Sequence, residues 1–201
     1  MPINPTFYGS VDEIGGKVRE IVEKGIRQAM DCFNKGKFDN EQQFQELLYY
    51  ILADELQKEN MLFAKTKDGK DLILLIREKI TKEKYKRGDA KKKTHGRLDI
   101  AILDSKDRIF PKDGENLKQI PLSFGIEIKL NKTDSRWEEE MNYLYDKLEL
   151  EVTSPPNDRY IIFLSTRDPK KFKFMKEYRE WLAEHSDVTV RSNKKELEST
   201  R

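Results

Sequence analysis

The 201-residue sequence is poor in the side chains that bind soft metals, with one cysteine and two histidines: Cys32, His95 and His185. A single cysteine excludes a disulfide framework within the chain and a zinc site built on several thiolates. The two histidines lie far apart in the sequence, which argues against a histidine-based metal centre. The composition therefore gives no indication of a structural zinc domain.

Long apolar segments are also missing. The longest apolar runs, Leu72–Ile76 and Tyr160–Leu164, are far shorter than the ~18 residues of a membrane-spanning helix. The first residues contain no basic segment followed by an apolar stretch, so we predict no signal peptide. We therefore expect a soluble, cytoplasmic protein without a membrane partner.

The chain has almost no excess of charge of one sign. Its 39 Lys and Arg residues and 37 Asp and Glu residues give a net charge of +2. This balance excludes a uniformly basic nucleic-acid binder but leaves local basic patches open. Charged residues make up 38% of the chain, which predicts a heavily solvated surface on an ordinary folded domain.

The spacing of apolar residues predicts an α/β fold with a mixed sheet. Helices are predicted at residues 11–33, 40–57, 136–152 and 169–184, and strands at 72–81, 97–103, 122–130, 160–165 and 188–191. Residues 1–38 form an N-terminal helical extension in this interpretation, and residues 39–201 form the main domain. The length agrees with one such domain.

The predicted strand 97–103 carries an acidic residue among apolar ones. Because side chains alternate along a strand, Asp99 is expected on one face with Ala101 and Leu103. The opposite face would carry Leu98, Ile100 and Ile102.

The predicted strand 122–130 places Glu127 and Lys129 on one face, together with Gly125, which leaves space beside Glu127. Acid-x-lysine triplets are common in this sequence, but the others lie in polar, turn-like segments. Glu127-Ile-Lys129 is the triplet embedded in an apolar strand, so its two charges are expected to share one face.

Two carboxylates that converge from adjacent strands form an oxygen site suited to Mg²⁺ or Mn²⁺. Such a metal lowers the pKa of bound water and neutralises charge that builds on a phosphodiester. Lys129 lies about 7 Å further along the strand than Glu127, at ~3.3 Å per residue, where an ammonium could orient the attacking water. The alternative is an amphipathic strand pair with a solvated charged face.

The segments Gly96-Arg-Leu-Asp99-Ile-Ala-Ile and Phe124-Gly-Ile-Glu127-Ile-Lys129-Leu resemble the core motif of the PD-(D/E)XK nuclease superfamily. That superfamily includes restriction endonucleases, Holliday-junction resolvases and repair nucleases. The resemblance covers roughly residues 40–165, and Leu98 stands at the variable position of the name-giving proline.

The resemblance implies a restriction-endonuclease-like core, with a central mixed sheet flanked by helices. It further implies that Asp99, Glu127 and the carbonyl of Ile128 bind Mg²⁺ or Mn²⁺, and that Lys129 activates water. The leading helix of such nucleases often supplies another acid, for which Glu46 is the first candidate and Glu41 the second. The alternative for Glu46 is a solvated helix residue.

A basic run leads into the Asp99 strand. Residues 82–97 hold eight basic and two acidic side chains, which predicts a phosphate-tracking loop beside the site or, alternatively, a solvated surface run. The candidate DNA-contacting residues are Lys84, Lys86, Arg87, Lys91, Lys92, Lys93 and Arg97. The outer face of helix 136–152 is acidic, so DNA should avoid it.

Together these features predict an Mg²⁺-dependent endodeoxyribonuclease, with DNA favoured over RNA as the substrate. One alternative is a non-catalytic nucleic-acid-binding or assembly subunit that keeps the nuclease fold. Another is an interaction module of a restriction or phage-defence system, whose partner subunit docks on the acidic helix. A homodimer is compatible with the nuclease hypothesis, because two sites related by a two-fold axis can cut both strands of a duplex.

Overall fold

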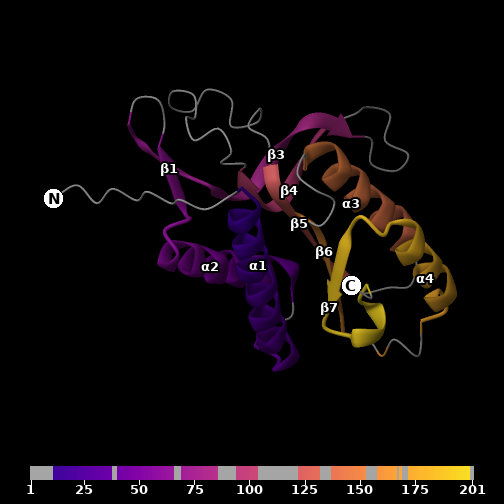
Figure 1. Ribbon diagram of the computed structural model, residues 1–201. Helices are drawn as coiled ribbons and strands as arrows, with labels where there is room; N and C mark the ends of the chain where they lie inside the picture. The colour runs from indigo at the N-terminus through magenta and orange to yellow at the C-terminus, as the bar shows by residue number, and fades with distance from the viewer. Residues whose placement is uncertain are drawn as a thin grey trace.

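The computed structural model describes residues 11–37, 40–65, 69–85, 94–103, 122–131, 137–152, 158–166, 168 and 172–199. These residues form an α/β fold with four α-helices and a mixed sheet of five strands. Helices α1 and α2 lie on one side of the sheet and α3 and α4 on the other, which gives three layers (Figure 1). The expected mixed sheet flanked by helices is therefore confirmed.

The elements follow the predicted order. The helices are α1 (Val11–Asn34), α2 (Glu41–Lys58), α3 (Trp137–Glu151) and α4 (Met175–Glu184), with a short 3₁₀ turn, η4 (Lys195–Leu197), near the end. The strands are β1 (Phe63–Lys65), β2 (Asp71–Ile73), β3 (Leu75–Tyr85), β4 (Thr94–Leu103), β5 (Leu122–Asn131), β6 (Arg159–Ser165) and β7 (Thr189–Ser192).

The main sheet has the strand order β3-β4-β5-β6-β7. β3, β4 and β5 pair antiparallel, whereas β5, β6 and β7 pair parallel. A separate hairpin of β1 and β2 was not predicted. The sequence presents residues 72–76 as one apolar run, but the structure divides this run at Leu74 between β2 and β3. β3 also continues to Tyr85 and β4 begins at Thr94, so both ends of the predicted basic loop are strand.

Helix α4 begins later than predicted. Phe172 and Phe174 are both buried and stack on each other with ring centroids 5.0 Å apart, ahead of the first helical residue, Met175. Residues two apart cannot share one helix face, so this aromatic pair requires a non-helical segment. The rest of the predicted segment, residues 169–171, lies outside the described residues.

Helix α1 is part of the main core. Its buried residues, including Val22 and Ile26, join a cluster with Leu52 of α2 and Ile126 of β5. A side-chain carbon at Gly25 would lie 2.8 Å from Leu52 Cδ2, so the glycine allows α1 and α2 to approach closely. The described part of the predicted N-terminal extension thus packs directly on the sheet.

Ion pairs attach α1 to the far half of the sheet. Glu23 accepts two hydrogen bonds from the Arg191 guanidinium of β7, at 3.0 and 2.7 Å. Arg19 donates to Asp158, just before β6, at 2.8 Å. The bidentate Arg191 pair fixes the helix over β7.

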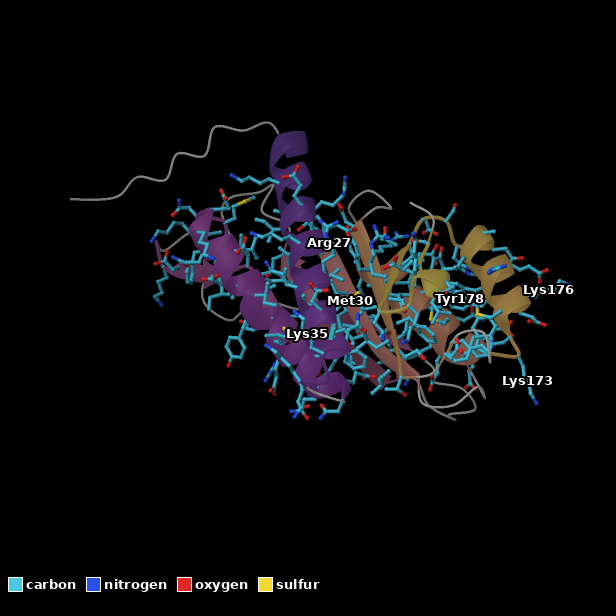
Figure 2. All side chains as sticks on the ribbon, turned by 90° about the horizontal axis from the view of Figure 1, so that it is seen from below. Arg27, Met30, Lys35, Lys173, Lys176 and Tyr178 are labelled. Atoms are coloured by element: carbon cyan, nitrogen blue, oxygen red, sulfur yellow. The ribbon has the colours of Figure 1, made fainter. Side chains whose placement is uncertain are left out.

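The opposite side of the sheet is covered by α3 and α4. Leu148 and Val152 pack over Gly125, where an added side-chain carbon would lie 2.8 Å and 2.7 Å from them. Figure 2 shows the two sides of the sheet, marked by Met30 on α1 and the buried Tyr178 on α4. Gly125 is thus required for the close seating of α3.

The alternation of β3 and β4 changes phase near Glu78. The register pairs Arg77 with Ile100 and Lys79 with Leu98, which leaves Glu78 opposite Asp99. Glu78 has a φ of 54°, a left-handed conformation that is uncommon for a residue other than glycine. Leu98 consequently packs in the α3-side cluster and Ile100 in the α2-side cluster, although they lie two residues apart.

This phase change overturns the predicted face of Asp99. Ala101 and Leu103 belong to the α3-side cluster, whereas Asp99 lines a cavity beside α2. Strict alternation fails at the position where Glu78, opposite Asp99, has a positive φ, an irregularity that the apolar pattern does not encode.

Candidate functional site

The candidate site lies where β4 and β5 part. The ladder between the described residues of these strands runs from Leu103–Leu122 to Ile100–Ile126 and ends there. Beyond that point Asp99 Oδ2 accepts a hydrogen bond from the Ile128 N–H at 2.6 Å. The Asp99 carboxylate therefore takes the place of the β4 backbone carbonyl that would pair with the Ile128 N–H if the ladder continued.

Helix α2 supplies a second carboxylate to the same strand edge. Glu41 Oε2 accepts from the Leu130 N–H at 2.9 Å. Residues two apart in a strand present their N–H and C=O groups on the same edge. The edge of β5 beyond the ladder is therefore held by carboxylates from β4 and α2, beside the main-chain carbonyls of Ile128 and Leu130.

Asp99 borders an open cavity of about 360 Å³ on the α2 side. The lining residues are Glu41, Gln42, Gln45, Arg77, Glu78, Arg97 and Asp99. Gln45 Nε2 donates to both Glu78 Oε1 and the Asp99 carbonyl at 2.8 Å, which ties α2 to β3 and β4. Burial raises the pKa of Asp99 to about 7, although the Ile128 hydrogen bond and the Lys147 charge lower it.

Glu127 is almost completely buried, with 2% exposure, and faces α3. Lys147 Nζ lies 2.7 Å from each of its two carboxylate oxygens. Burial and then the charge of Asp99 raise the pKa of Glu127 well above its usual range, and Lys147 opposes both. Asp99 and Glu127 are therefore electrostatically coupled, although they approach the gap from different sides of the sheet.

Lys129 lies on the same face of β5 as Glu127, which confirms that prediction. Its Nζ is 3.2 Å from Glu140 Oε1 near the start of α3, and a quarter of the side chain, 24%, is exposed. Gly125, Glu127 and Lys129 thus all meet α3, opposite Leu148, Lys147 and Glu140 respectively.

The two acid candidates of α2 occupy different places. Glu46 Oε1 accepts from Gln42 Nε2 at 3.2 Å and lies 3.3 Å from Arg77 NH1, outside the cavity lining. Glu41, the second candidate, lines the cavity beside Asp99. The fold therefore brings Glu41 to the gap and leaves Glu46 on the Arg77 side of the helix.

The candidate DNA-contacting residues are described only in part. Arg97 is exposed, lines the cavity and lies 3.7 Å from Glu78 Oε2. Lys84 is exposed on β3, with its backbone opposite His95. The remaining candidates, Lys86, Arg87, Lys91, Lys92 and Lys93, lie outside the described residues.

Sequence reasoning missed two charged residues at the gap, Lys147 and Arg77. Lys147 falls between Leu144 and Leu148 on the apolar stripe of α3, so a lysine at a core position was the available signal. Arg77 offers no comparable signal, because it is an exposed strand residue that follows Leu75 of the α2-side cluster by two positions and so faces the cavity by regular alternation along β3.

The donor set at the gap has the chemistry that Mg²⁺ or Mn²⁺ prefers, since Asp99, Glu127 and the Ile128 carbonyl offer only oxygen ligands. Glu127 Oε1 is also buried without a hydrogen bond of regular geometry. Among the described residues, no group of three or more His, Cys, Asp or Glu side chains could hold a metal ion. A Mg²⁺ ion bound through one or two carboxylates and several waters does not require such a group.

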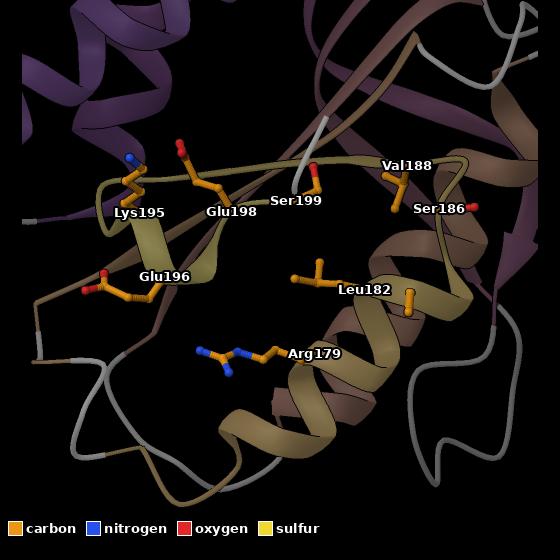
Figure 3. A pocket seen from close by; sticks show the side chains of 9 residues that line it. Arg179, Leu182, Ser186, Val188, Lys195, Glu196, Glu198 and Ser199 are labelled. Atoms are coloured by element: carbon orange, nitrogen blue, oxygen red, sulfur yellow. The ribbon is translucent and has the colours of Figure 1, made fainter.

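A second, larger cavity of about 550 Å³ lies between α4 and the segment that follows β7. In Figure 3, Arg179 and Leu182 extend from α4 toward this segment, which carries Glu196 and Glu198. None of the residues that line this cavity lies at the β4–β5 gap. The larger cavity is therefore separate from the candidate site.

Comparisons of the chain with protein-family models, with curated proteins and with solved structures found no match. None of the described helices combines the length and the apolar character needed to cross a membrane.

Proposed function

We propose that this protein is a metal-dependent nuclease that hydrolyses phosphodiester bonds in DNA. The observation that carries the proposal is the parting of β4 and β5 at Ile100–Ile126, where Asp99 and Glu41 take over the N–H groups of β5 beside the buried Glu127. The resemblance of the Asp99 and Glu127-Ile-Lys129 segments to the PD-(D/E)XK core motif supports the same function.

In this proposal Asp99, Glu127 and the Ile128 carbonyl would hold Mg²⁺ or Mn²⁺, with Glu41 as the additional acid from α2. The bound ion would lower the pKa of water and neutralise charge on the scissile phosphate. Lys129 orients the attacking water from the same face as Glu127. The Asp99–Ile128 hydrogen bond fixes one carboxylate before any ligand arrives, which reduces the reorganisation that the reaction requires.

The cavity rim offers contacts for the DNA backbone. Arg77 and Arg97 flank Asp99 and are both exposed, so each could bind a phosphate oxygen. Arg77 lies 3.3 Å from the Glu46 carboxylate, and Arg97 lies 3.7 Å from the Glu78 carboxylate. Exposed pairs of this kind are weak, and a phosphate can replace the carboxylate partner.

One observation favours the alternative of a non-catalytic nucleic-acid-binding or assembly subunit. Both charges of the Glu-x-Lys segment already have partners within the fold, Glu127 with Lys147 and Lys129 with Glu140. A subunit that kept the fold for binding alone would need no free carboxylate. Such a subunit would bind DNA without requiring a divalent cation.

The test is cleavage of supercoiled plasmid and of single-stranded DNA, each with Mg²⁺, with Mn²⁺ and with EDTA. Wild type is compared with Asp99→Asn, Lys129→Gln and the control Asp54→Asn, which changes an exposed residue of α2. We expect metal-dependent cutting by wild type and the control, and its loss in both site variants. Cutting that persists in Asp99→Asn would refute the assignment, and DNA binding without cutting would favour the subunit.

A further inference from the structure

Lys147 is the charged residue at the gap that the proposed mechanism does not use. We propose that Lys147 of α3 is a positioning residue of this site, which holds the Glu127 carboxylate against the opening between β4 and β5. The inference rests on the proposed function and adds a second helix, α3, to the elements that form its site.

The contacts of Lys147 span the two strands that part. Its Nζ donates to Glu127 of β5 at 2.7 Å and to the Arg97 carbonyl of β4 at 2.8 Å. The same ammonium lies 5.1 Å from the centre of the Tyr143 ring, within the range of a cation–π contact. One ammonium therefore bridges β4 and β5 beyond the end of their backbone ladder.

The aliphatic part of the Lys147 side chain is also closely packed. Lys147 is 5% exposed, and a side-chain carbon at Gly96 would lie 3.2 Å from its Cδ, so the stem runs closely over this glycine. A buried stem with a fully engaged head group has few alternative rotamers, which is the property a positioning residue requires.

The charge of Lys147 also reaches both carboxylates. It opposes the effect of burial on the pKa of Asp99 and on that of Glu127. Lys129 makes a different kind of contact, an ion pair with Glu140 in which both side chains are partly exposed. Lys129 is therefore a matched control: a lysine of the same strand face that does not contact Glu127 in the structure.

The experiment measures Mn²⁺ affinity by titration calorimetry for wild type, Lys147→Gln, Lys147→Arg and Lys129→Gln, each checked for folding by circular dichroism. Glutamine keeps hydrogen-bond donors but loses the charge, and arginine keeps the charge but cannot place one nitrogen between Glu127 and Arg97. Loss of a residue that orients a metal ligand weakens metal binding by about 10–100-fold. We expect a loss of this order in both Lys147 variants and unchanged affinity in Lys129→Gln.

DNA cleavage supplies a second readout. In the Lys147 variants the Mn²⁺ concentration that gives half-maximal cleavage should rise, while the KM for DNA stays at its wild-type value. A folded Lys147→Gln or Lys147→Arg protein that binds Mn²⁺ as tightly as wild type would overturn the inference and leave the proposed nuclease intact. Wild-type protein that neither binds Mn²⁺ nor cuts DNA would remove the proposed function, and this inference with it.

Discussion

Two lysines under α3 are buried to almost the same extent but differ in their partners, and this difference predicts opposite effects on stability. Lys147 is 5% and Lys79 is 4% exposed. Lys147 contacts Glu127, the Arg97 carbonyl and the Tyr143 ring. Lys79 Nζ, in contrast, is buried without a hydrogen-bond partner among the described residues. We therefore compare Lys147→Met with Lys79→Met, since methionine keeps most of the lysine volume.

The expected magnitudes follow from what each substitution leaves behind. Lys147→Met leaves Glu127 buried without its counter-charge, which costs about 3–5 kcal/mol of unfolding free energy. Lys79→Met removes a buried ammonium that lacks a partner, whose desolvation costs about 1–3 kcal/mol. Glu151 loses a nearby positive charge in that variant, so we expect a gain near the lower limit, about 1 kcal/mol.

The assay is urea unfolding at pH 7, followed by circular dichroism, with Tm as a second measure. For a protein of this size each kcal/mol corresponds to roughly 2–4 °C in Tm. Burial lowers the pKa of Lys79 from its usual 10.5, so its gain on substitution should shrink as the pH rises towards 10.5 and the unfolded lysine also loses its proton. Equal destabilisation by both substitutions would refute the reasoning, because burial rather than partners would then set the cost.

Three further predictions concern the site and its support. Burial raises the pKa of Asp99 from 3.8 to about 7, so its charge opposes folding above pH 7 and not below 3.8; Asp99→Asn should therefore raise Tm at pH 8 and leave it nearly unchanged at pH 3.5. Gly125→Ala should lower the unfolding free energy by about 1–3 kcal/mol in a urea titration, because the added carbon meets Leu148 and Val152; a neutral effect would show that α3 can shift. Glu140→Gln should change stability by less than about 1 kcal/mol, since its pair with Lys129 is partly exposed; a larger loss of Tm would contradict this.

The sequence predicted the elements wherever apolar periodicity decides the structure. The helices near 11–33, 40–57 and 136–152 appear within two residues of their expected ends, as does the strand near 122–130. Glu127 and Lys129 share one face of β5, because regular alternation holds along that strand. These elements are set by local spacing, which a single sequence contains.

The parts that escaped prediction depend on tertiary geometry. Asp99 changes face where Glu78, opposite it, adopts a left-handed conformation, and glutamate gives no warning of a positive φ. The pairing of Lys147 with Glu127 joins residues of different elements, so spacing alone cannot specify it. The lysine at a core position of α3 signalled a buried charge but not the identity of its partner.

The ion pair between Glu23 and Arg191 has a consequence for the order in which the protein folds. Its residues lie 168 positions apart, so the contact that seats α1 on β7 forms only after Arg191 has been synthesised. Until β3 to β6 have been synthesised, the apolar stripe shared by Val22, Ile26 and Leu52 lacks the complete sheet that it covers in the folded protein. Contacts between distant parts of a chain slow folding and prolong the exposure of apolar surface. A ribosome-bound chain that ends before β3 would therefore expose the apolar side of α1 and α2, a surface that chaperones bind during translation.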